Sequence, residues 1–365
     1  MKKTDYNEFL YDEDLKIKPI ATAETIPSAW YTGKDFFEFD TKTVFTKTWQ
    51  HVGYCGQILK QGDYFVTEVA DNPLIVVRDK EKRIRAFYNV CLHRGGPVAT
   101  KDGNTKVFQC RYHGWTYDLD GKLRGTPEFE GVDEFEKRNY CLAPIRVEEW
   151  GGMLFICLDD TVKPFETFIP GIRERILPNK LESKTFHKRV DYTIKCNWKV
   201  YVDNYLEGYH LNMVHPGLAK ILDYRNYVTE TNDHYSLQQS PFKDENGIYG
   251  SPDDMAYYYF VFPNFMMNIL PGRLQTNLVI PVAHNETHVR FDYYYDEMDT
   301  DEANKFIEDD LRISDEIQAE DIDICEHVQK GLRSDAYDKG RFSVKREECV
   351  YHFQCLLKMA YKSAF

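Results

Sequence analysis

Two short motifs in this sequence each place a cysteine close to a histidine. Cys91-Leu92-His93 and Cys110-Arg111-Tyr112-His113 both open glycine-containing loops, CLHRGG and CRYHGW. Structural zinc sites usually pair cysteine with cysteine and histidine with histidine. Mixed pairs instead suit a [2Fe–2S] cluster in which two cysteines bind one iron and two histidines bind the other. We therefore predict that these four side chains bind such a cluster, with a zinc site or four unrelated side chains as the alternatives.

The residues around these motifs predict a small all-β domain over residues 46–160. Short β-branched or aromatic runs are bounded by Gly, Asp, Asn or Pro, which is typical of strands separated by turns. Asp120-Gly121 is a strong two-residue hairpin signal. The predicted strands are Tyr64–Ala70, Leu74–Val77, Arg85–Val90 and Met153–Leu158.

Residues 161–365 predict a larger second domain, on which we expect the polar segment 1–45 to pack. An apolar stripe at helical spacing predicts an amphipathic helix that continues until Pro216 and Gly217 stop it. Residues 255–296 read as long strands, and Asp301–Gly331 as a second long helix that begins with acids, which suits the helix dipole. Strands followed by helices indicate an α+β fold. The stripe consists of Trp198, Val202, Tyr205, Leu206 and Tyr209.

Composition argues against several classes of function. Lys and Arg number 46 and Asp and Glu number 59, so the net charge of −13 lacks the basic footprint that nucleic-acid binding needs. The start has no apolar run of a signal peptide, and no stretch approaches the roughly 20 apolar residues of a membrane span. Nine scattered cysteines fit a reducing cytosol, so we expect a cytoplasmic protein. No G-x-G-x-x-G fingerprint for FAD or a nicotinamide cofactor is present, so electrons for the predicted iron–sulfur cluster must come from a partner protein.

A second group of polar residues follows the first predicted helix in DNYLEGYHLNMVHP. Glu207 and His210 are three residues apart and share a helix face. His215 lies about 140° further round an ideal helix, so both histidines can bind one metal only if the helix distorts or ends between them. Two histidines need a carboxylate to complete a facial triad for Fe(II), and the acid-rich second long helix offers one in the segment AEDIDICEHVQKGL.

The stretch CLHRGG followed by CRYHGWTYDLDG resembles the Rieske motif. Together with the second group, it makes most of the chain similar to the α (oxygenase) subunit of Rieske non-haem iron oxygenases. The resemblance implies a small Rieske domain and a larger α+β catalytic domain with an antiparallel sheet and long helices, in a helix-grip-like arrangement. It places the mononuclear iron on His210, His215 and Asp321, and the pattern ED-x3-CE favours Asp321 over Asp323.

The same resemblance gives two further residues a role at the iron. Most members carry an Asp three residues before the first histidine, which bridges the iron site of one subunit to a Rieske histidine of its neighbour. Glu207 occupies that position here, a departure that leaves the bridge within reach of a longer side chain. Asn204 resembles the asparagine that members carry beside the iron.

Within this family the sequence looks like the branch that acts on quaternary ammonium compounds. Glu207, the segment Ile26–Thr32 and the C-terminal segment Glu320–Arg341 carry that likeness. Aromatic residues are 15% of the chain, and aromatic faces bind trimethylammonium groups by cation–π attraction. We predict substrate contacts for Tyr201, Tyr205 and Phe262. They come from a larger pool that also contains Tyr257, Tyr258, Tyr259, Phe260 and Phe265.

The resemblance implies a complete reaction and its partners. O2 and a small cationic substrate meet at Fe(II), and electrons pass from NAD(P)H through a separate flavin/iron–sulfur reductase to the Rieske cluster. Members are commonly homotrimers, which would put His93, His113 and Glu207 at a subunit interface. Arg273 and Arg290 leave open whether a substrate carboxylate is bound. The rival interpretations are an aromatic-ring hydroxylase and a Rieske electron carrier without oxygenase activity.

Overall fold

The computed structural model describes residues 10–243 and 247–363 of the 365-residue chain. The chain divides into two compact units. The small unit comprises Phe45–Phe168, and the large unit comprises the chain up to Val44 together with Ile169–Phe365. The N-terminal segment therefore belongs with the C-terminal half of the sequence.

The small unit is built of antiparallel β-structure. A seven-stranded sheet has the order β1-β10-β9-β4-β3-β2-β5, and a three-stranded sheet has the order β6-β7-β8. The four strands predicted in this segment are confirmed as β2, β3, β4 and β10. The bounds are β1 (Gln50–Tyr54), β2 (Asp63–Val69), β3 (Asn72–Arg78), β4 (Ile84–Tyr88), β5 (Gly103–Asn104), β6 (Phe108–Gln109), β7 (Thr116–Tyr117), β8 (Leu123–Gly125), β9 (Pro144–Trp150) and β10 (Met153–Cys157). Short helices are Cys55–Ile58, Lys137–Tyr140 and α3 (Phe165–Phe168).

The predicted Asp120-Gly121 hairpin is confirmed between β7 and β8. The backbone N–H of Asp118 donates to the carbonyl of Lys122 at 2.9 Å. Gly121 has a φ of +87°, and a Cβ there would lie 2.6 Å from the ring of Phe87, so both backbone and space require glycine. This hairpin closes the loop system that carries the second Cys/His motif, between β6 and β7.

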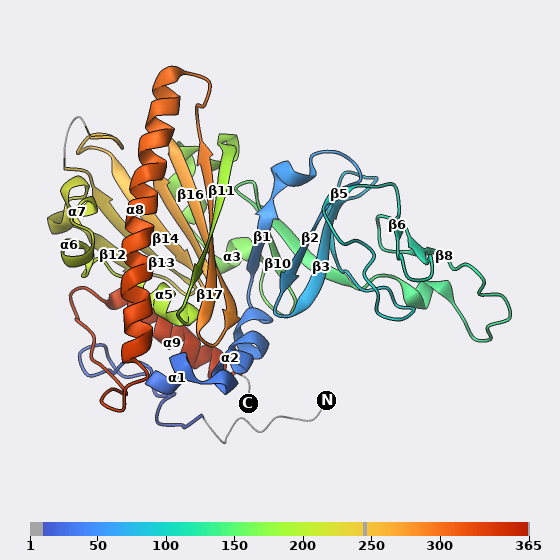
Figure 1. Ribbon diagram of the computed structural model, residues 1–365, viewed down its shortest axis with the longest axis horizontal. Helices are drawn as coiled ribbons and strands as arrows, with labels where there is room; N and C mark the ends of the chain where they lie inside the picture. The colour runs from blue at the N-terminus through green and yellow to red at the C-terminus, as the bar shows by residue number, and fades with distance from the viewer. Residues whose placement is uncertain (1–9, 244–246, 364–365) are drawn as a thin grey trace. The chain divides into compact units, whose positions relative to one another are not determined.

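The large unit contains a second seven-stranded antiparallel sheet, of order β11-β17-β16-β15-β14-β13-β12 (Figure 1). The strands predicted over 255–296 are confirmed as β14 to β17. The bounds are β11 (Thr185–Ile194), β12 (Val228–Thr231), β13 (Tyr235–Pro241), β14 (Met255–Val261), β15 (Phe265–Leu270), β16 (Arg273–Ala283) and β17 (Glu286–Tyr295).

Helix α8 (Asp301–Gly331) crosses one face of this sheet (Figure 1). Its predicted bounds and the α+β organisation of the unit are confirmed. The Thr300 hydroxyl accepts the backbone N–H of Ala303 at 3.1 Å, and two acids stand in the first turn, as a stable helix N-terminus requires. The other helices are α1 (Ser28–Thr32), α2 (Lys34–Asp40), α4 (Ile172–Ile176), α5 (Trp198–Tyr205), α6 (Leu211–Val214), α7 (Leu218–Ile221) and α9 (Glu348–Lys362). Single turns lie at Thr41–Phe45, Leu177–Asn179, Leu181–Ser183 and Tyr224–Asn226.

The helix predicted to continue to Pro216 ends at Tyr205 instead, and that prediction was wrong. The Glu207 carboxylate accepts the backbone N–H groups of Tyr209 and His210 and so restarts the chain as α6. Gly208 lies against the ring of Tyr227, where a Cβ would be 3.0 Å from a ring atom. Tyr209, expected on the apolar stripe, is consequently 57% exposed.

A buried carboxylate joins three distant segments of the large unit. Asp40, at the end of α2, accepts a hydrogen bond from the indole N–H of Trp198 at 2.9 Å and forms an ion pair with Lys199. The hydroxyl of Tyr361 on α9 also donates to it. All four side chains are buried, so α2, α5 and α9 are joined through one charged cluster. Helix α9 has no counterpart among the predicted elements.

We expect the Lys199→Met substitution to destabilise the protein by about 3–5 kcal/mol, because it leaves the Asp40 charge buried without its partner. Lys42→Met is the control, since Lys42 is exposed and lies 4.0 Å from Glu38, an arrangement that contributes about 0–1 kcal/mol. Urea unfolding of the cofactor-loaded protein measures the difference. Equal midpoints for the two variants would contradict the importance of the cluster.

Candidate metal centres and substrate cavity

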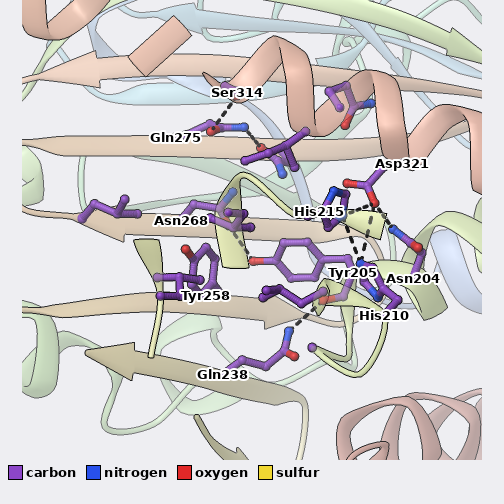
Figure 2. A pocket seen from close by; sticks show the side chains of 18 of the residues that line it. Asn204, Tyr205, His210, His215, Gln238, Tyr258, Asn268, Gln275, Ser314 and Asp321 are labelled. Carbon is purple, nitrogen blue, oxygen red and sulfur yellow. Dashed lines mark hydrogen bonds and ion pairs between the residues drawn. The ribbon is translucent and has the colours of Figure 1, made fainter. Parts of the chain in front are cut away.

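Three predicted ligands of the large unit meet at one point. One donor atom each from His210, His215 and Asp321 lies within 4.8 Å of the other two (Figure 2). His215 Nε2 is 3.0 Å from Asp321 Oδ1 and 3.2 Å from His210 Nε2, and His210 Nε2 is 3.8 Å from Asp321 Oδ1. Two imidazole nitrogens and one carboxylate oxygen converging in this way fit an Fe(II) ion with open coordination positions.

The structure separates the two candidate acids of α8. The side chain of Asp321 is 14% exposed and faces the histidines. The side chain of Asp323 is 77% exposed and lies 3.6 Å from Nδ1 of His327 instead. Two residues along a helix correspond to a rotation of about 200°, so the two carboxylates point to different sides of α8.

Each of the three donors is held by a second polar side chain. Glu207 Oε1 lies 2.6 Å from His210 Nδ1, and Asn204 Nδ2 donates to Asp321 Oδ1 at 2.6 Å. Both Glu207 and Asn204 were predicted to stand beside the iron. Carboxylates on the outer nitrogen of a histidine fix the tautomer and ring orientation that a metal needs.

Glu320 plays the same part for His215, and sequence reasoning missed it. Its Oε2 lies 2.7 Å from His215 Nδ1, so Glu320 and Asp321 contact opposite nitrogens of one ring. Burial alone would lower the pKa of His215, but Asp321 and Glu320 outweigh burial and raise it. The only sequence signal was the pair of adjacent acids, Glu320 and Asp321. Neighbouring residues of a helix point about 100° apart, so the pair alone does not indicate that both acids contact one ring.

A cavity adjoins this site and contains about 870 Å³ of empty space, part of it open to solvent. Tyr201 and Tyr205 line it as predicted. Phe262 does not: it is buried in the core, with its ring centroid 6.2 Å from that of Phe353. The aromatic lining otherwise comes from Tyr227, Tyr249, Tyr258 and Phe291, of which only Tyr258 was in the predicted pool.

Amide side chains add polar groups to the cavity wall (Figure 2), which also contains several Leu residues and an Ile. The Tyr205 hydroxyl donates to Asn268 Oδ1 at 2.7 Å, and Gln238 Nε2 donates to the Tyr205 carbonyl at 2.7 Å. Gln275 Nε2 donates to Asn277 Oδ1 at 2.8 Å. Hydrogen-bonded tyrosine and amide groups therefore lie in the wall of the space beside the predicted metal ligands, together with aliphatic side chains.

The Cys/His loops of the small unit bring their four predicted ligands to one end of a packed core. Cys91 and Cys110 are buried, and the Tyr117 hydroxyl donates to Cys91 Sγ at 3.3 Å. The rings of His93 and His113 lie 4.6 Å apart between centroids. Loop hydrogen bonds, such as that from the Gly114 N–H to the Cys110 carbonyl at 3.0 Å, hold the backbone of each motif in a turn.

The donor set of these loops fits a two-iron cluster. Nδ1 of His93 is buried without a hydrogen-bond partner in the described structure, as expected of a histidine nitrogen that binds a metal. One zinc ion needs ligand atoms about 3.3–3.8 Å apart, since its bonds are about 2.0–2.3 Å long. Among the described residues, the four Cys/His side chains do not form so compact a set. A cluster that divides its ligands between two irons accommodates the wider spacing.

Comparisons with known proteins agree with both sites. Residues 48–136 match the family model described as the Rieske [2Fe-2S] domain, and residues 181–363 match the ring hydroxylating alpha subunit (catalytic domain). Choline monooxygenase of Arabidopsis thaliana, a chloroplastic protein, is 37% identical over 97% of this chain and 86% of its own length. The carnitine monooxygenase oxygenase subunit of Escherichia coli K12 is 32% identical over 97% of this chain and 98% of its own length.

A solved structure shows the same fold. A quaternary ammonium Rieske monooxygenase, described as giving insights into carnitine oxidation and inter-subunit electron transfer, superposes with a TM-score of 0.83. The two chains are 28% identical, and the match covers 93% of this chain and 96% of the other. Within residues 10–243 and 247–363, no helix is long and apolar enough to cross a membrane.

Two metal-binding domains in this order define an iron-dependent oxygenase. The chain belongs to the α-subunit family of Rieske non-haem iron oxygenases and is a Rieske non-haem iron monooxygenase. Its cofactors are a Rieske [2Fe–2S] cluster and a mononuclear iron, and electrons come from a reductase, as the sequence predicted.

We expect Glu320→Ala to weaken binding of the mononuclear iron by about 10- to 100-fold, because His215 loses the group that orients its ring. Asp323→Asn on the same helix is the control. The readout is total iron per Rieske cluster after dialysis against a chelator, with the visible absorbance of the cluster as internal standard. Equal iron retention by the two variants would show that Glu320 does not orient the ligand.

Proposed function

We propose that this monooxygenase hydroxylates a small quaternary ammonium compound. The observation that carries the proposal is the cavity beside the His210–His215–Asp321 set, which combines tyrosine faces with hydrogen-bonding amides. Tyrosine rings attract a caged ammonium by cation–π interaction. A neutral arene has no charge for these tyrosine faces to attract and no donor or acceptor for the amides. The similarity to choline and carnitine monooxygenases supports the same substrate class.

We assign the iron ligands and their supports as follows. His210, His215 and Asp321 bind the mononuclear iron, while Glu207, Glu320 and Asn204 orient those three ligands. When bound, this iron supplies the chemistry of O2 activation. The four Cys/His side chains of the small unit, Cys91, His93, Cys110 and His113, bind the cluster that supplies single electrons.

We further propose a homotrimer in the cytoplasm that receives electrons from a separate flavin/iron–sulfur reductase using NAD(P)H. Tyr209 and Met213, beside the iron ligands, are 57% and 86% exposed, and Leu92 and Tyr112, beside the Rieske ligands, are 40% and 58% exposed. Large apolar side chains exposed next to two redox sites suit a contact between subunits. In such a contact Glu207 would bridge His210 to a Rieske histidine of the neighbour.

A single turnover of the chemically reduced protein with O2 tests the substrate class. We expect oxidation of at least one of choline, glycine betaine, carnitine and proline betaine, detected by mass spectrometry, and no oxidation of simple arenes. His210→Ala, which removes an iron ligand, is the matched control and should give no product. Oxidised arene together with unchanged quaternary amines would favour the ring-hydroxylase interpretation instead.

Mixed oligomers test the trimer. His93→Ala and His210→Ala subunits are each inactive alone, because one lacks the cluster and the other the iron. If electrons cross between subunits, co-expression of the two variants restores part of the activity with reductase. Activity that stays at zero in purified mixed trimers would place electron transfer within one chain.

A further inference from the structure

One basic side chain stands in the wall of the substrate cavity. Arg273, Gln275 and Asn277 alternate along β16 and therefore share the face that lines the cavity. Among the described lining residues, Arg273 is the only Lys or Arg, and it is 5% exposed. The other arginine considered from the sequence, Arg290, is outside this lining and pairs with Asp191 at 3.1 Å.

The orientation of Arg273 is fixed by a buried acid behind it. Its Nη1 lies 2.9 Å from Asp310 Oδ1 on α8, and Asp310 is fully buried. Asp310 also accepts the hydroxyls of Tyr249 at 2.8 Å and Tyr295 at 2.5 Å, so both carboxylate oxygens are occupied. Arg273 lines the cavity and Asp310 does not, so the arginine is the member of this ion pair that adjoins the substrate space.

The guanidinium has hydrogen-bonding capacity left over. Its Nε is buried and has no hydrogen-bond partner in the described structure. The rings of Tyr249 and Tyr293 lie 5.8 and 5.9 Å from the guanidinium carbon, so these aromatic faces already surround a cation of the protein itself. A buried donor without a partner is costly, and an oxygen acceptor on the substrate would satisfy it.

This basic group lies at the end of the cavity remote from the iron ligands. Asp310 and Asp321 are eleven residues apart on the inner face of α8, a separation of about 16 Å along the helix axis. Ser314 and Gln275, which lie between these ends, are drawn away from the histidines in Figure 2. Like charges repel in a desolvated space, so a substrate ammonium is disfavoured beside Arg273 and favoured toward Tyr205 and the iron.

We infer that Arg273 binds the carboxylate of a betaine-type zwitterion and thereby points its ammonium end at the iron. This inference rests on the proposed function and narrows it. A carboxylate offers only hydrogen-bond acceptors and forms charge-assisted hydrogen bonds with a guanidinium such as that of Arg273. The hydroxyl of choline carries no charge and is also a hydrogen-bond donor, so it suits this guanidinium less well.

The orientation determines which carbon reacts. A carbon bonded to nitrogen lies nearest the iron, and one atom of O2 enters its C–H bond while the other leaves as water, using two electrons from the reductase and two protons. The hydroxylated product then breaks its C–N bond, releasing a tertiary amine, an aldehyde and one proton. For glycine betaine the products are dimethylglycine and formaldehyde.

Glycine betaine and choline form a matched pair for the test, because they share the ammonium and differ at the other end. In the wild type we expect kcat/KM to favour glycine betaine, with products of C–N cleavage. The double variant Arg273→Gln/Asp310→Asn removes both charges and leaves none unpaired. It should lower kcat/KM for glycine betaine about tenfold or more while changing that for choline by less than about threefold.

Arg290→Gln on the neighbouring strand is the control and should leave both values unchanged. Should the double variant fail to fold, competition on the wild-type holoenzyme replaces it: glycine betaine should bind about tenfold more tightly than ethyltrimethylammonium, which lacks the carboxylate. Equal binding of glycine betaine and ethyltrimethylammonium would overturn the inference, as would equal losses of kcat/KM for both substrates in the folded double variant. It would also be overturned if the main product were an aldehyde hydrate formed from choline with its C–N bond intact. In each of these outcomes the protein still binds or oxidises a quaternary amine. If the proposed function itself is wrong, no quaternary amine is oxidised.

Discussion

The inner face of α8 carries polar side chains at positions 310, 314, 318 and 321, and both ends of the cavity depend on it. Asp310 pairs with Arg273 at one end, and Asp321 meets the two histidines at the other. In between, Gln318 accepts the hydroxyl of Tyr201 at 2.7 Å. Because one uninterrupted helix presents all four residues, its rise of about 1.5 Å per residue fixes the distance between the charged end and the metal ligands.

The histidines reach this helix only because the preceding helix stops early. Had α5 continued, His210 and His215 would have lain about 140° apart round its axis. Glu207 both accepts the backbone N–H groups that restart the chain and contacts His210 Nδ1. One carboxylate therefore shapes the backbone and orients a ligand. Its additional methylene relative to Asp gives it the reach for both.

Most of the architecture was predictable because it rests on local patterns. The strands around the Cys/His loops follow β-branched and aromatic runs, and α8 follows its acidic start and its helical periodicity. The ligands were predictable because their residue types and spacing reflect metal chemistry. Spacing alone did not separate Asp321 from Asp323; the family resemblance favoured Asp321, and the rotation of α8 gives the physical reason, because only Asp321 faces the histidines.

What sequence could not supply depends on contacts between distant segments. The end of α5 at Tyr205 depends on Glu207 and Tyr227. The position of α9 depends partly on the hydrogen bond from Tyr361 to Asp40. The role of Glu320 depends on where His215 lies. Phe262 looked equivalent to Tyr205 by composition, yet its strand end turns into the core. Tyr205 lines the cavity from the end of α5, whereas Phe262 follows β14 and packs in the core, so the elements around each aromatic residue decide its role.

The alternation of β16 has a practical consequence for changing what the enzyme accepts. Arg273, Gln275 and Asn277 line the cavity from one strand, whereas the proposed iron ligands come from the α6 region and α8. Substitutions at these three positions, with Asp310 changed together with Arg273, leave the proposed iron ligands unaltered because those ligands lie at other positions. We therefore expect that selection from a library randomised at these few codons changes the substrate range while the proposed iron ligands are kept.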